Sequence, residues 1–327
     1  MTRADFAILG AGAIGSILAA HLARAGHTVT VIARGDRARA VERDGLRIKG
    51  LADFSAQVGV ITDPSQLQAA DTLIVATKTP GTEAALARLK HVRVGAALSI
   101  QNGVLKNELL ARAFGAQRVL GALADTSGEL LPSGEVLFTR NVNLPLGEPA
   151  GGISDRARRI AGMIDEAGVR SVAVADIVSM EWSKFTVWLG LMSMAVTMRS
   201  VSWRYLMDAD CAQVLVRLIR EVAAVAAAQG IALVEGAAAL PLRTVLEAPE
   251  PDAVEAVRKA GEQMRSRAPH HRMSALQDLE AGRPLEVEET FGYAVRKARE
   301  LGLSLPLLES CHHLVAAIDR IRGAGAS

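Results

Sequence analysis

Residues 6–15 read FAILGAGAIG, and this stretch decides the fold of the first half of the chain. The apolar run Phe6–Leu9 predicts a strand that ends at a G-x-G-x-x-G turn. A helical pattern follows over Ala13–Ala25, and a run rich in β-branched residues covers Thr28–Ala33. This strand, turn, helix and second strand within about thirty residues form the context in which the motif indicates dinucleotide binding.

Each glycine of the turn has its own physical reason. Gly10 permits the tight turn, Gly12 lets the backbone approach a pyrophosphate, and Gly15 lets helix and strand pack closely. The helix N-terminus offers unpaired N–H groups and a partial positive charge to an anion. A purely structural glycine turn is the alternative. We expect the following residues to bind the cofactor: Gly10, Ala11, Gly12, Ala13, Ile14 and Gly15.

The end of the second strand distinguishes the two nicotinamide cofactors. An acidic residue there would bind a ribose 2′-hydroxyl and repel a 2′-phosphate. The strand ends instead at Arg34, and Arg37 and Arg39 follow it closely. A guanidinium can stack on adenine and pair with a phosphate. The missing acid favours NADP over NAD, although Asp36 lies among the arginines and a solvated charged loop is the alternative interpretation.

The rest of the first half alternates short apolar runs with helical patterns. Near-continuous apolar strands separated by helices indicate a parallel sheet covered on both faces. Further strands are expected at 58–62, 72–76, 97–100, 119–122 and 169–174, with helices at 82–89, 105–114 and 156–167. The Gly- and Pro-rich segment 128–152 is expected to form hairpins or loops.

After about Ala175 the strand-like alternation nearly disappears and long helical patterns take over. Helices are expected at 177–199, 209–229, 252–265, 274–281, 286–301 and 306–321, and Gly323–Ser327 is expected to fray. The sequence therefore predicts an α/β domain over residues 1–175 and an all-helical domain over residues 176–327.

Composition excludes several classes of protein. The 327 residues carry 37 Lys+Arg and 35 Asp+Glu, so nothing indicates a nucleic-acid partner. The two cysteines, Cys211 and Cys311, exclude a disulfide framework and a Cys-based zinc site, and no metal site is expected. The apolar stretch Phe6–Ala20 lacks a cleavage-like segment. Phe185–Met198 is shorter than the ~20 residues that cross a bilayer. We therefore expect a cytoplasmic protein without a membrane partner.

Together these residues resemble the ketopantoate reductases (2-dehydropantoate 2-reductases) over essentially the full length of the chain. Beside the opening residues 6–34, several stretches are similar to family motifs. They are Thr77-Lys78, Gln101-Asn102-Gly103-Val104, Trp182-Ser183-Lys184-Phe185, Ser274-Ala275-Leu276-Gln277-Asp278, Gly282-Arg283, Glu286, Leu301-Gly302-Leu303 and Pro306. Each match alone is unspecific, but their order and spacing are typical of the family.

The resemblance implies a Rossmann domain followed by an all-helical domain, with the active site between them. It implies hydride transfer from NADPH to the keto carbon of a 2-oxo acid. Lys184 falls on the family's catalytic lysine. The other implied positions are Lys78 and Asn102 beside nicotinamide and substrate, Glu286 near the cofactor, Ser274 at the substrate, and Ser127 where the backbone approaches the cofactor.

The chemistry of carbonyl reduction is consistent with these residues. Hydride addition develops an alkoxide, which a proton-donating cation both stabilises and protonates. Lysine in a semi-buried cleft can be tuned toward neutral pH, which arginine cannot. Glu286 would hold such a lysine in place and oppose that tuning. Without the resemblance, a snorkelling surface lysine is the favoured interpretation of Lys184.

The chain departs from the family at Trp188 and Met192. The family places substrate-binding asparagines four and eight residues after the lysine, on one helix face with it. Because a buried hydroxyl without a partner costs roughly 1–3 kcal/mol, we expect a substrate more hydrophobic than ketopantoate. Ordinary core packing is the alternative for both side chains.

Two other readings stay open at this point. A β-hydroxyacid dehydrogenase-like enzyme also has a lysine on a helix after a Rossmann domain. A non-catalytic NADP-binding regulatory protein could result from loss of the two asparagines. Apolar helices such as Val214–Ala228 leave a homodimer open, and the adjacent pairs His270-His271 and His312-His313 make no metal-binding face.

Overall fold

The computed structural model describes residues 2–324, so of the segment expected to fray only Gly323 and Ala324 are described, at the end of a helix. The chain divides into two compact units. The first, the α/β unit, comprises residues 1–102 and 106–178, and the second, the helical unit, comprises residues 103–105 and 179–327. The α/β fold class with a following helical part is confirmed.

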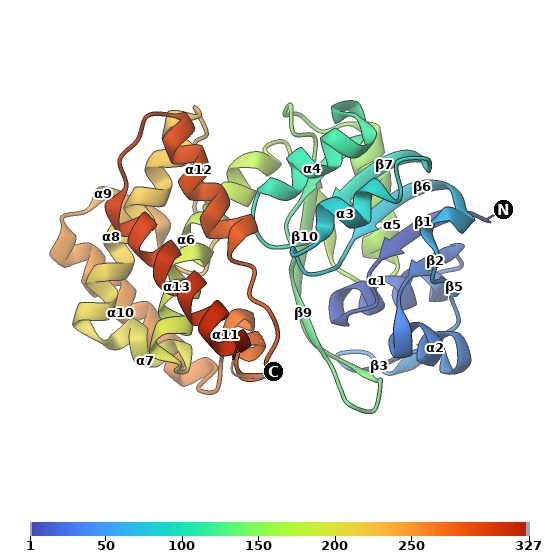
Figure 1. Cartoon of the computed structure of the whole chain (residues 1–327), viewed down its shortest axis with the longest axis horizontal. Coiled ribbons are helices and arrows are strands. Elements are labelled where there is room, and N and C mark those ends of the chain that lie inside the picture. Colours follow the sequence, from blue (N-terminus) through green and yellow to red (C-terminus); the bar gives the residue numbers. More distant parts are fainter. Residues whose placement is uncertain (1, 325–327) are drawn as a thin grey trace. The chain divides into compact units, whose positions relative to one another are not determined.

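The α/β unit is built on a sheet whose central strands are parallel (Figure 1). Their order is β8 (Val119–Ala122), β7 (Arg93–Ser99), β6 (Leu67–Val75), β1 (Thr2–Leu9), β2 (Val29–Ile32) and β5 (Gly59–Ile61). Phe6, Ile8 and Val31 are completely buried, as near-continuous apolar strands covered on both faces require. The predicted strands at these positions are therefore present.

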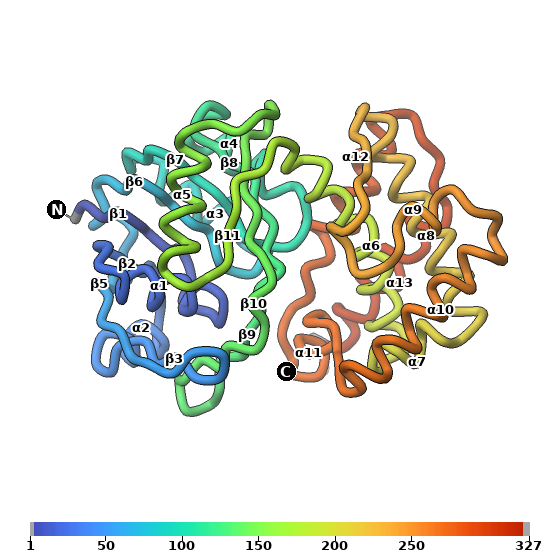
Figure 2. Tube along the Cα trace, turned by 180° about the vertical axis from the view of Figure 1, so that it is seen from behind, coloured from blue at the N-terminus to red at the C-terminus, as the bar shows by residue number. Residues whose placement is uncertain are grey.

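Helices cover both faces of this sheet. The helices are α1 (Ala13–Arg24), α3 (Thr82–Ala87), α4 (Leu105–Phe114) and α5 (Asp155–Glu166). Figure 1 shows α3 and α4 in front of the strands with α5 behind them, and Figure 2 shows α5 in front from the opposite side. The first strand runs into α1 and the chain returns to β2, which pairs with β1 in parallel register.

The remainder of the sheet is only partly as predicted. The segment expected to form hairpins or loops contains the antiparallel pair β9 (Asp125–Leu130) and β10 (Val136–Gly147). β10 also pairs with β3 (Leu46–Gly50) and with β11 (Ser171–Ala173), and β3 pairs with β4 (Phe54–Ala56). The strands β3 and β4 and the helix α2 (Gly35–Asp44) were not predicted. In α2 only Ala38 and Val41 are buried, so its sequence carries too weak an apolar pattern to indicate a helix.

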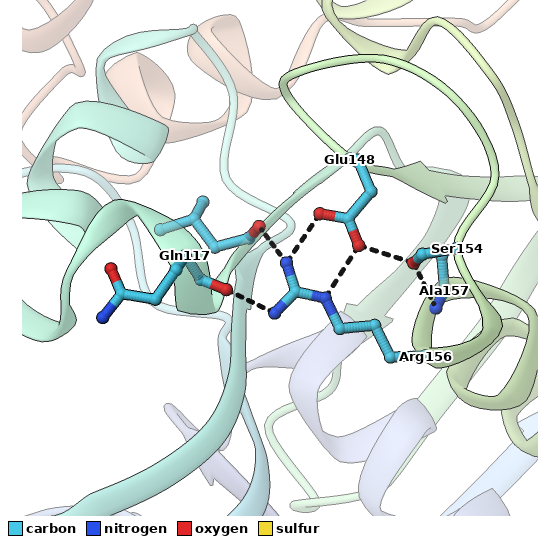
Figure 3. A network of polar contacts seen from close by, with 6 residues as sticks. Gln117, Glu148, Ser154, Arg156 and Ala157 are labelled. Atoms are coloured by element: carbon cyan, nitrogen blue, oxygen red, sulfur yellow. Dashed lines mark hydrogen bonds and ion pairs between the residues drawn. The ribbon is translucent and has the colours of Figure 1, made fainter.

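A network of polar contacts joins α5 to the end of β10 and to the start of β8 (Figure 3). The Arg156 guanidinium donates to the Glu148 carboxylate from Nε at 2.7 Å and from Nη2 at 2.6 Å. It also donates to the backbone oxygens of Gln117 and Val119. Ser154 caps α5 by accepting from the Ala157 N–H, and its hydroxyl donates to Glu148.

The helical unit is arranged around α6 (Ile177–Met198). From Glu181 to Val196 every residue of α6 except Lys184 is buried, so the apolar stretch 185–198 is a helix that is buried up to Val196, whereas Met198 is 48% exposed. The other helices are α7 (Ser202–Met207), α8 (Ala209–Ala228), α9 (Leu242–Glu247), α10 (Glu250–Arg267), α11 (Ser274–Glu280), α12 (Tyr293–Glu300) and α13 (Pro306–Ala324). Across residues 2–324, no helix combines the length and hydropathy that a bilayer crossing needs.

This unit differs from expectation in several details, and its short helices α7 and α9 were not predicted. The helix predicted over 286–301 instead begins with a π-turn, Glu288–Gly292, before α12. The Gly292 N–H donates to the Val287 carbonyl five residues back, at 3.0 Å. In addition, the apolar face of α8 packs against α10, α7, α9 and α13 within the unit. The buried apolar residues of 214–228, which suggested that a homodimer was possible, are therefore packed against other helices of the same unit.

We expect Arg156→Met to lower the free energy of unfolding by about 2 kcal/mol, because it removes the donor of a carboxylate and two backbone carbonyls. The control is Arg158→Met on the same helix, since Arg158 pairs with Asp155, whose side chain is 95% exposed. Exposed pairs contribute ~0.5 kcal/mol. Urea denaturation measures the free energy of unfolding of both variants. Equal losses of stability in the two would contradict the structural role given to Arg156.

The same variant has a pH signature. The hydrogen bonds from Arg156 hold the pKa of Glu148 below its usual range. Stability from a lowered carboxyl pKa is present above the ordinary glutamate pKa and is lost as pH falls through the lowered value. The stability difference between wild type and Arg156→Met should therefore be full at neutral pH and shrink in acid.

Candidate cofactor and catalytic site

The glycine-rich turn lies against the end of β6. Gly10 has a φ of +108°, and a Cβ atom there would lie 2.8 Å from Thr77 Cγ2 and 2.9 Å from the Thr77 backbone nitrogen. A Cβ atom at Gly15 would collide with the Gly10 carbonyl oxygen. At Gly12, in contrast, nothing lies within 4 Å of that position. The protein itself therefore requires glycine at 10 and 15, whereas Gly12 opens space beside the turn.

That open space adjoins the N-terminus of α1. Gly12 is the N-cap of this helix, no side chain caps it, and its first turn holds no acidic residue. The first N–H groups of a helix have no intrahelical acceptor. The residues from Gly10 to Gly15 thus fit the pyrophosphate of a dinucleotide. They offer backbone N–H donors and open space beside Gly12, and no acidic side chain in the first turn of the helix repels the anion.

Arg34 lies at the end of β2, next to this turn. The Gly10 N–H donates to the Ile32 carbonyl at 2.9 Å, so the end of β2 adjoins the start of the turn. Arg34 is the N-cap of α2 and its side chain is exposed. The nearby Asp36 pairs with Arg39 on the surface. No acidic side chain occupies the first position after β2.

The ends of β6 and β7 are tied together by Gln101, which sequence reasoning did not single out. Its side-chain amide nitrogen donates to Thr82 Oγ1 at 2.7 Å, to the Lys78 carbonyl at 3.1 Å and to Thr77 Oγ1 at 3.2 Å. Only 7% of Gln101 is exposed. The loop that carries Lys78 is thereby held beside the segment that carries Asn102.

Lys106 fixes the other side of the same segment. Its ammonium, on a residue that is 5% exposed, donates to the Gln101 carbonyl at 3.0 Å and to the Ala122 carbonyl at 2.5 Å. No sequence signal distinguishes this buried lysine from a surface one on α4. The backbone next to Asn102 is therefore held by two side chains, those of Gln101 and Lys106.

Gly103 begins the short segment that packs with the helical unit. Its φ is +81°, which favours glycine. A Cβ atom there would lie 3.3 Å from Thr290 Cγ2 and 4.0 Å from Phe185 Cε2. The turn after Asn102 thus contacts the residue that follows Lys184, and it contacts the π-turn that follows Glu286.

Lys184 occupies the one half-buried position in a buried stretch of α6. The residues beside it are held by packing and hydrogen bonds. Phe185 and Trp182 make an edge-to-face contact with ring centroids 5.7 Å apart. The fully buried Ser183 donates to the Ser179 carbonyl at 2.7 Å and accepts from the Val234 N–H at 2.7 Å. The backbone on either side of Lys184 is therefore held by packing and by hydrogen bonds.

Trp188 and Met192 follow Lys184 at successive turns of α6. Trp188 retains 8% exposure, whereas Met192 is completely buried. Full burial of Met192 agrees with the core-packing interpretation of that side chain. Trp188 is therefore the stronger candidate for contact with a substrate.

The remaining predicted residues are divided between the units. Ser274 is half-buried and begins α11, and Glu286 is 5% exposed. The Thr290 hydroxyl donates to the Glu286 carbonyl. Burial, with Glu286 and Glu288 nearby, raises the pKa of Glu289. Ser127 lies half-buried in β9, in the α/β unit, where its carbonyl accepts from Thr139 Oγ1 at 3.2 Å.

Comparison with known proteins places the chain in a family. The family model "Ketopantoate reductase PanE/ApbA" matches residues 6–151, and "Ketopantoate reductase PanE/ApbA C terminal" matches residues 176–319. The 2-dehydropantoate 2-reductase of Archaeoglobus fulgidus is 30% identical over 312 residues, which cover 95% of this chain and 97% of that protein.

Solved structures agree. A ketopantoate reductase from Ralstonia eutropha has a TM-score of 0.82 at 25% identity, covering 98% of this chain and 99% of that one. The ternary structure of D-mandelate dehydrogenase with NADH and anilino(oxo)acetate shares the fold, with a TM-score of 0.82 at 18% identity and coverage of 98% and 99%. The resemblance inferred from the motifs is confirmed: the chain belongs to the ketopantoate reductase family and is an oxidoreductase.

Proposed function

We propose that this enzyme reduces the keto group of a 2-oxo acid to a hydroxyl group with NADPH, in the manner of a 2-dehydropantoate 2-reductase. The observation that carries the proposal is Lys184, which the helical unit leaves half-buried within the otherwise buried stretch from Glu181 to Val196 of α6. Family membership and the fit of the glycine-rich turn to a pyrophosphate support it.

In the proposed reaction, bound NADPH supplies the hydride that adds to the keto carbon. The carbonyl electron pair moves to the oxygen, and the Lys184 ammonium stabilises the resulting alkoxide and gives it a proton. The products are a 2-hydroxy acid and NADP⁺, and solvent returns the proton to the amine. The packing of Trp182, Ser183 and Phe185 fixes the point on α6 from which the Lys184 side chain extends.

The predicted site residues take matching roles in this proposal. Residues 1–175 bind the cofactor through the glycine-rich turn, with Lys78, Asn102 and Ser127 nearby. Residues 176–327 supply Lys184, the substrate-binding Ser274 and Glu286, which we place near the cofactor. The mechanism requires no metal, because the ammonium supplies both the positive charge that polarises the carbonyl and the proton that the alkoxide accepts.

The proposal also names NADP rather than NAD. Arg34 is exposed beside the turn, and the nearest acid, Asp36, is occupied by Arg39. A guanidinium recognises a phosphate through two parallel hydrogen bonds.

Trp188 supports a substrate more hydrophobic than ketopantoate. It replaces the first of the family's two hydrogen-bonding asparagines with an apolar side chain that keeps 8% exposure, whereas Met192, at the second, is completely buried in the core. D-mandelate dehydrogenase, which shares the fold, was solved with anilino(oxo)acetate, an oxo acid that carries an aromatic ring. We therefore propose 2-oxo acids with branched or aromatic tails as substrates.

Lys184→Ala should lower kcat by roughly 10²- to 10⁴-fold, since it removes the proton donor. The dissociation constant for NADPH should stay unchanged. Lys259→Ala, an exposed lysine on α10, is the matched control and should retain full kcat. If Lys184→Ala turns over at the wild-type rate, the mechanism is wrong. If the wild type binds NADPH but reduces none of a panel of oxo acids, the protein is a non-catalytic binder.

Gly12→Ala should keep the free energy of unfolding within about 1 kcal/mol of wild type, because its φ of −70° suits alanine and its Cβ would meet open space. Cofactor affinity should nevertheless fall at least roughly tenfold, since the methyl group fills the space for the pyrophosphate. Gly10→Ala, where φ is +108°, should instead destabilise the fold. Thermal unfolding and nucleotide fluorescence separate the two effects.

Arg34→Ala should raise KM for NADPH roughly tenfold and leave KM for NADH unchanged. Steady-state kinetics with both cofactors test this expectation. Equal effects on the two cofactors would remove Arg34 from the 2′-phosphate site.

The substrate proposal predicts a higher kcat/KM for branched or aromatic 2-oxo acids than for ketopantoate. Trp188→Asn should move the ratio toward ketopantoate roughly tenfold, because it restores a hydrogen-bonding side chain. A wild-type preference for ketopantoate would overturn the hydrophobic-substrate proposal and leave the reductase assignment intact.

A further inference from the structure

Arg37 of α2 turns back from its own helix to the glycine-rich turn. Its Nε donates to the Ala11 carbonyl at 2.9 Å, and its Nη2 donates to Ser16 Oγ at 3.0 Å. Its Nη1 donates to the Gly134 carbonyl at 2.9 Å. One half-buried guanidinium therefore joins α2, the turn, the first helix and the β9–β10 hairpin.

The Ala11 carbonyl receives a second donor from Ser16. Ser16 is completely buried, and its hydroxyl donates to Ala11 O at 3.1 Å. In a planar trans peptide, the carbonyl of one residue and the N–H of the next point in opposite directions. Holding the Ala11 carbonyl from two sides therefore fixes the Gly12 N–H on the opposite side of that peptide plane. That N–H belongs to the residue beside which the turn leaves open space.

The charge of Arg37 is not compensated by a neighbouring acid. All three of its acceptors are neutral oxygens, and no ion pair involving Arg37 is found among the described residues. Burial lowers the pKa of Arg37, but an arginine stays charged. A partly desolvated cation without a counter-ion is costly, and an anion bound at the adjacent turn reduces that cost.

The hairpin holds Arg37 from its far side. Gly134 has a φ of +83° in the turn between β9 and β10. Arg47 of β3 donates to the neighbouring Ser133 carbonyl at 3.0 Å. Arg47 thus binds the same hairpin turn as Arg37, and among residues 2–324 no hydrogen bond from Arg47 to the glycine-rich turn is found.

We propose that Arg37, together with Ser16, is a positioning residue for dinucleotide binding: it orients the Ala11–Gly12 peptide so that its N–H faces the pyrophosphate, and it adds a fixed positive charge on the carbonyl side of that peptide. This inference rests on the proposed cofactor site. It separates Arg37 from Arg34, because a pyrophosphate is common to NADPH and NADH, whereas the 2′-phosphate belongs to NADPH alone.

The test measures dissociation constants for NADPH and NADH by nucleotide fluorescence without substrate, together with thermal unfolding. Arg37→Met keeps the aliphatic stem and removes both the donors and the charge. We expect roughly ten- to a hundredfold weaker binding of both cofactors by the same factor. Arg37→Lys keeps the positive charge but lacks the planar guanidinium that donates to three acceptors at once. It should therefore recover only part of the affinity that Arg37→Met loses. At saturating cofactor, kcat should stay at the wild-type value.

Two further variants make the test specific. Arg47→Gln releases the same hairpin turn and should leave both dissociation constants unchanged. Ser16→Ala removes one of the two hydrogen-bond donors to the Ala11 carbonyl. It should raise the dissociation constants for both cofactors by roughly three- to tenfold. Ser16→Ala also keeps the proposal testable if Arg37→Met does not fold.

Three outcomes would overturn the inference. The first is that Arg37→Met has a lower melting temperature but unchanged affinities for both cofactors. The second is that Arg37→Met loses affinity for NADPH alone. The third is that Arg47→Gln loses as much cofactor affinity as Arg37→Met. Failure of the proposed function looks different, because the wild type itself would then bind neither dinucleotide.

Discussion

The contact between the glycine-rich turn and the end of β6 is the constraint on which the α/β unit depends. Gly10 has no side chain, so the backbone of Thr77 lies where a Cβ would stand, and Gly15 lets α1 start directly over the Gly10 carbonyl. Any larger residue at either position would push α1 away from the sheet. The close approach leaves the N-terminus of α1 at the carboxyl edge of the parallel strands, where such sheets bind ligands.

The same edge gathers the other predicted cofactor residues. Arg34 follows β2, Lys78 follows β6 and Asn102 follows β7, and the carboxyl ends of parallel strands lie at one edge of the sheet. Interactions behind them hold these loops in place. Gln101 joins the loops after β6 and β7, Lys106 holds the Gln101 carbonyl, and Arg37 holds the turn. None of these three side chains has to touch a substrate to determine how the edge is arranged.

In the helical unit, α6 has no continuous polar face that would be turned toward solvent. Its orientation is therefore set by packing against the other helices. Trp182 and Phe185 pack edge to face, and Ser183 accepts the Val234 N–H from a distant loop. Within the stretch from Glu181 to Val196, these contacts leave Lys184 half-buried among buried residues. Because Gly103 lies beside Phe185 and Thr290, the short segment that begins at Gly103, the lysine helix and the segment after Glu286 meet within the helical unit.

Prediction from the sequence succeeded where apolar periodicity is strong and failed where charge or local geometry overrides it. The buried strands and α6 were expected from their apolar runs, whereas α2, with few buried residues, was not. The helix expected from Glu286 begins later, because the π-turn takes its first residues. The two roles of Gln101 and Lys106 arise from contacts between strand ends that are distant in sequence, and periodicity carries no information about such contacts.

The sequence by itself determined the family, the α/β and helical halves, the glycine-rich turn and the candidate lysine. It could do so because glycine spacing and apolar patterns follow from local sterics and burial. Only the tertiary structure decided that Gly12, and not Gly10 or Gly15, borders open space, that Arg37 is directed inward while Arg34 remains exposed, and that Met192 is completely buried. Those outcomes depend on which side chains meet across separate elements, and that is settled by packing rather than by the order of residues along the chain.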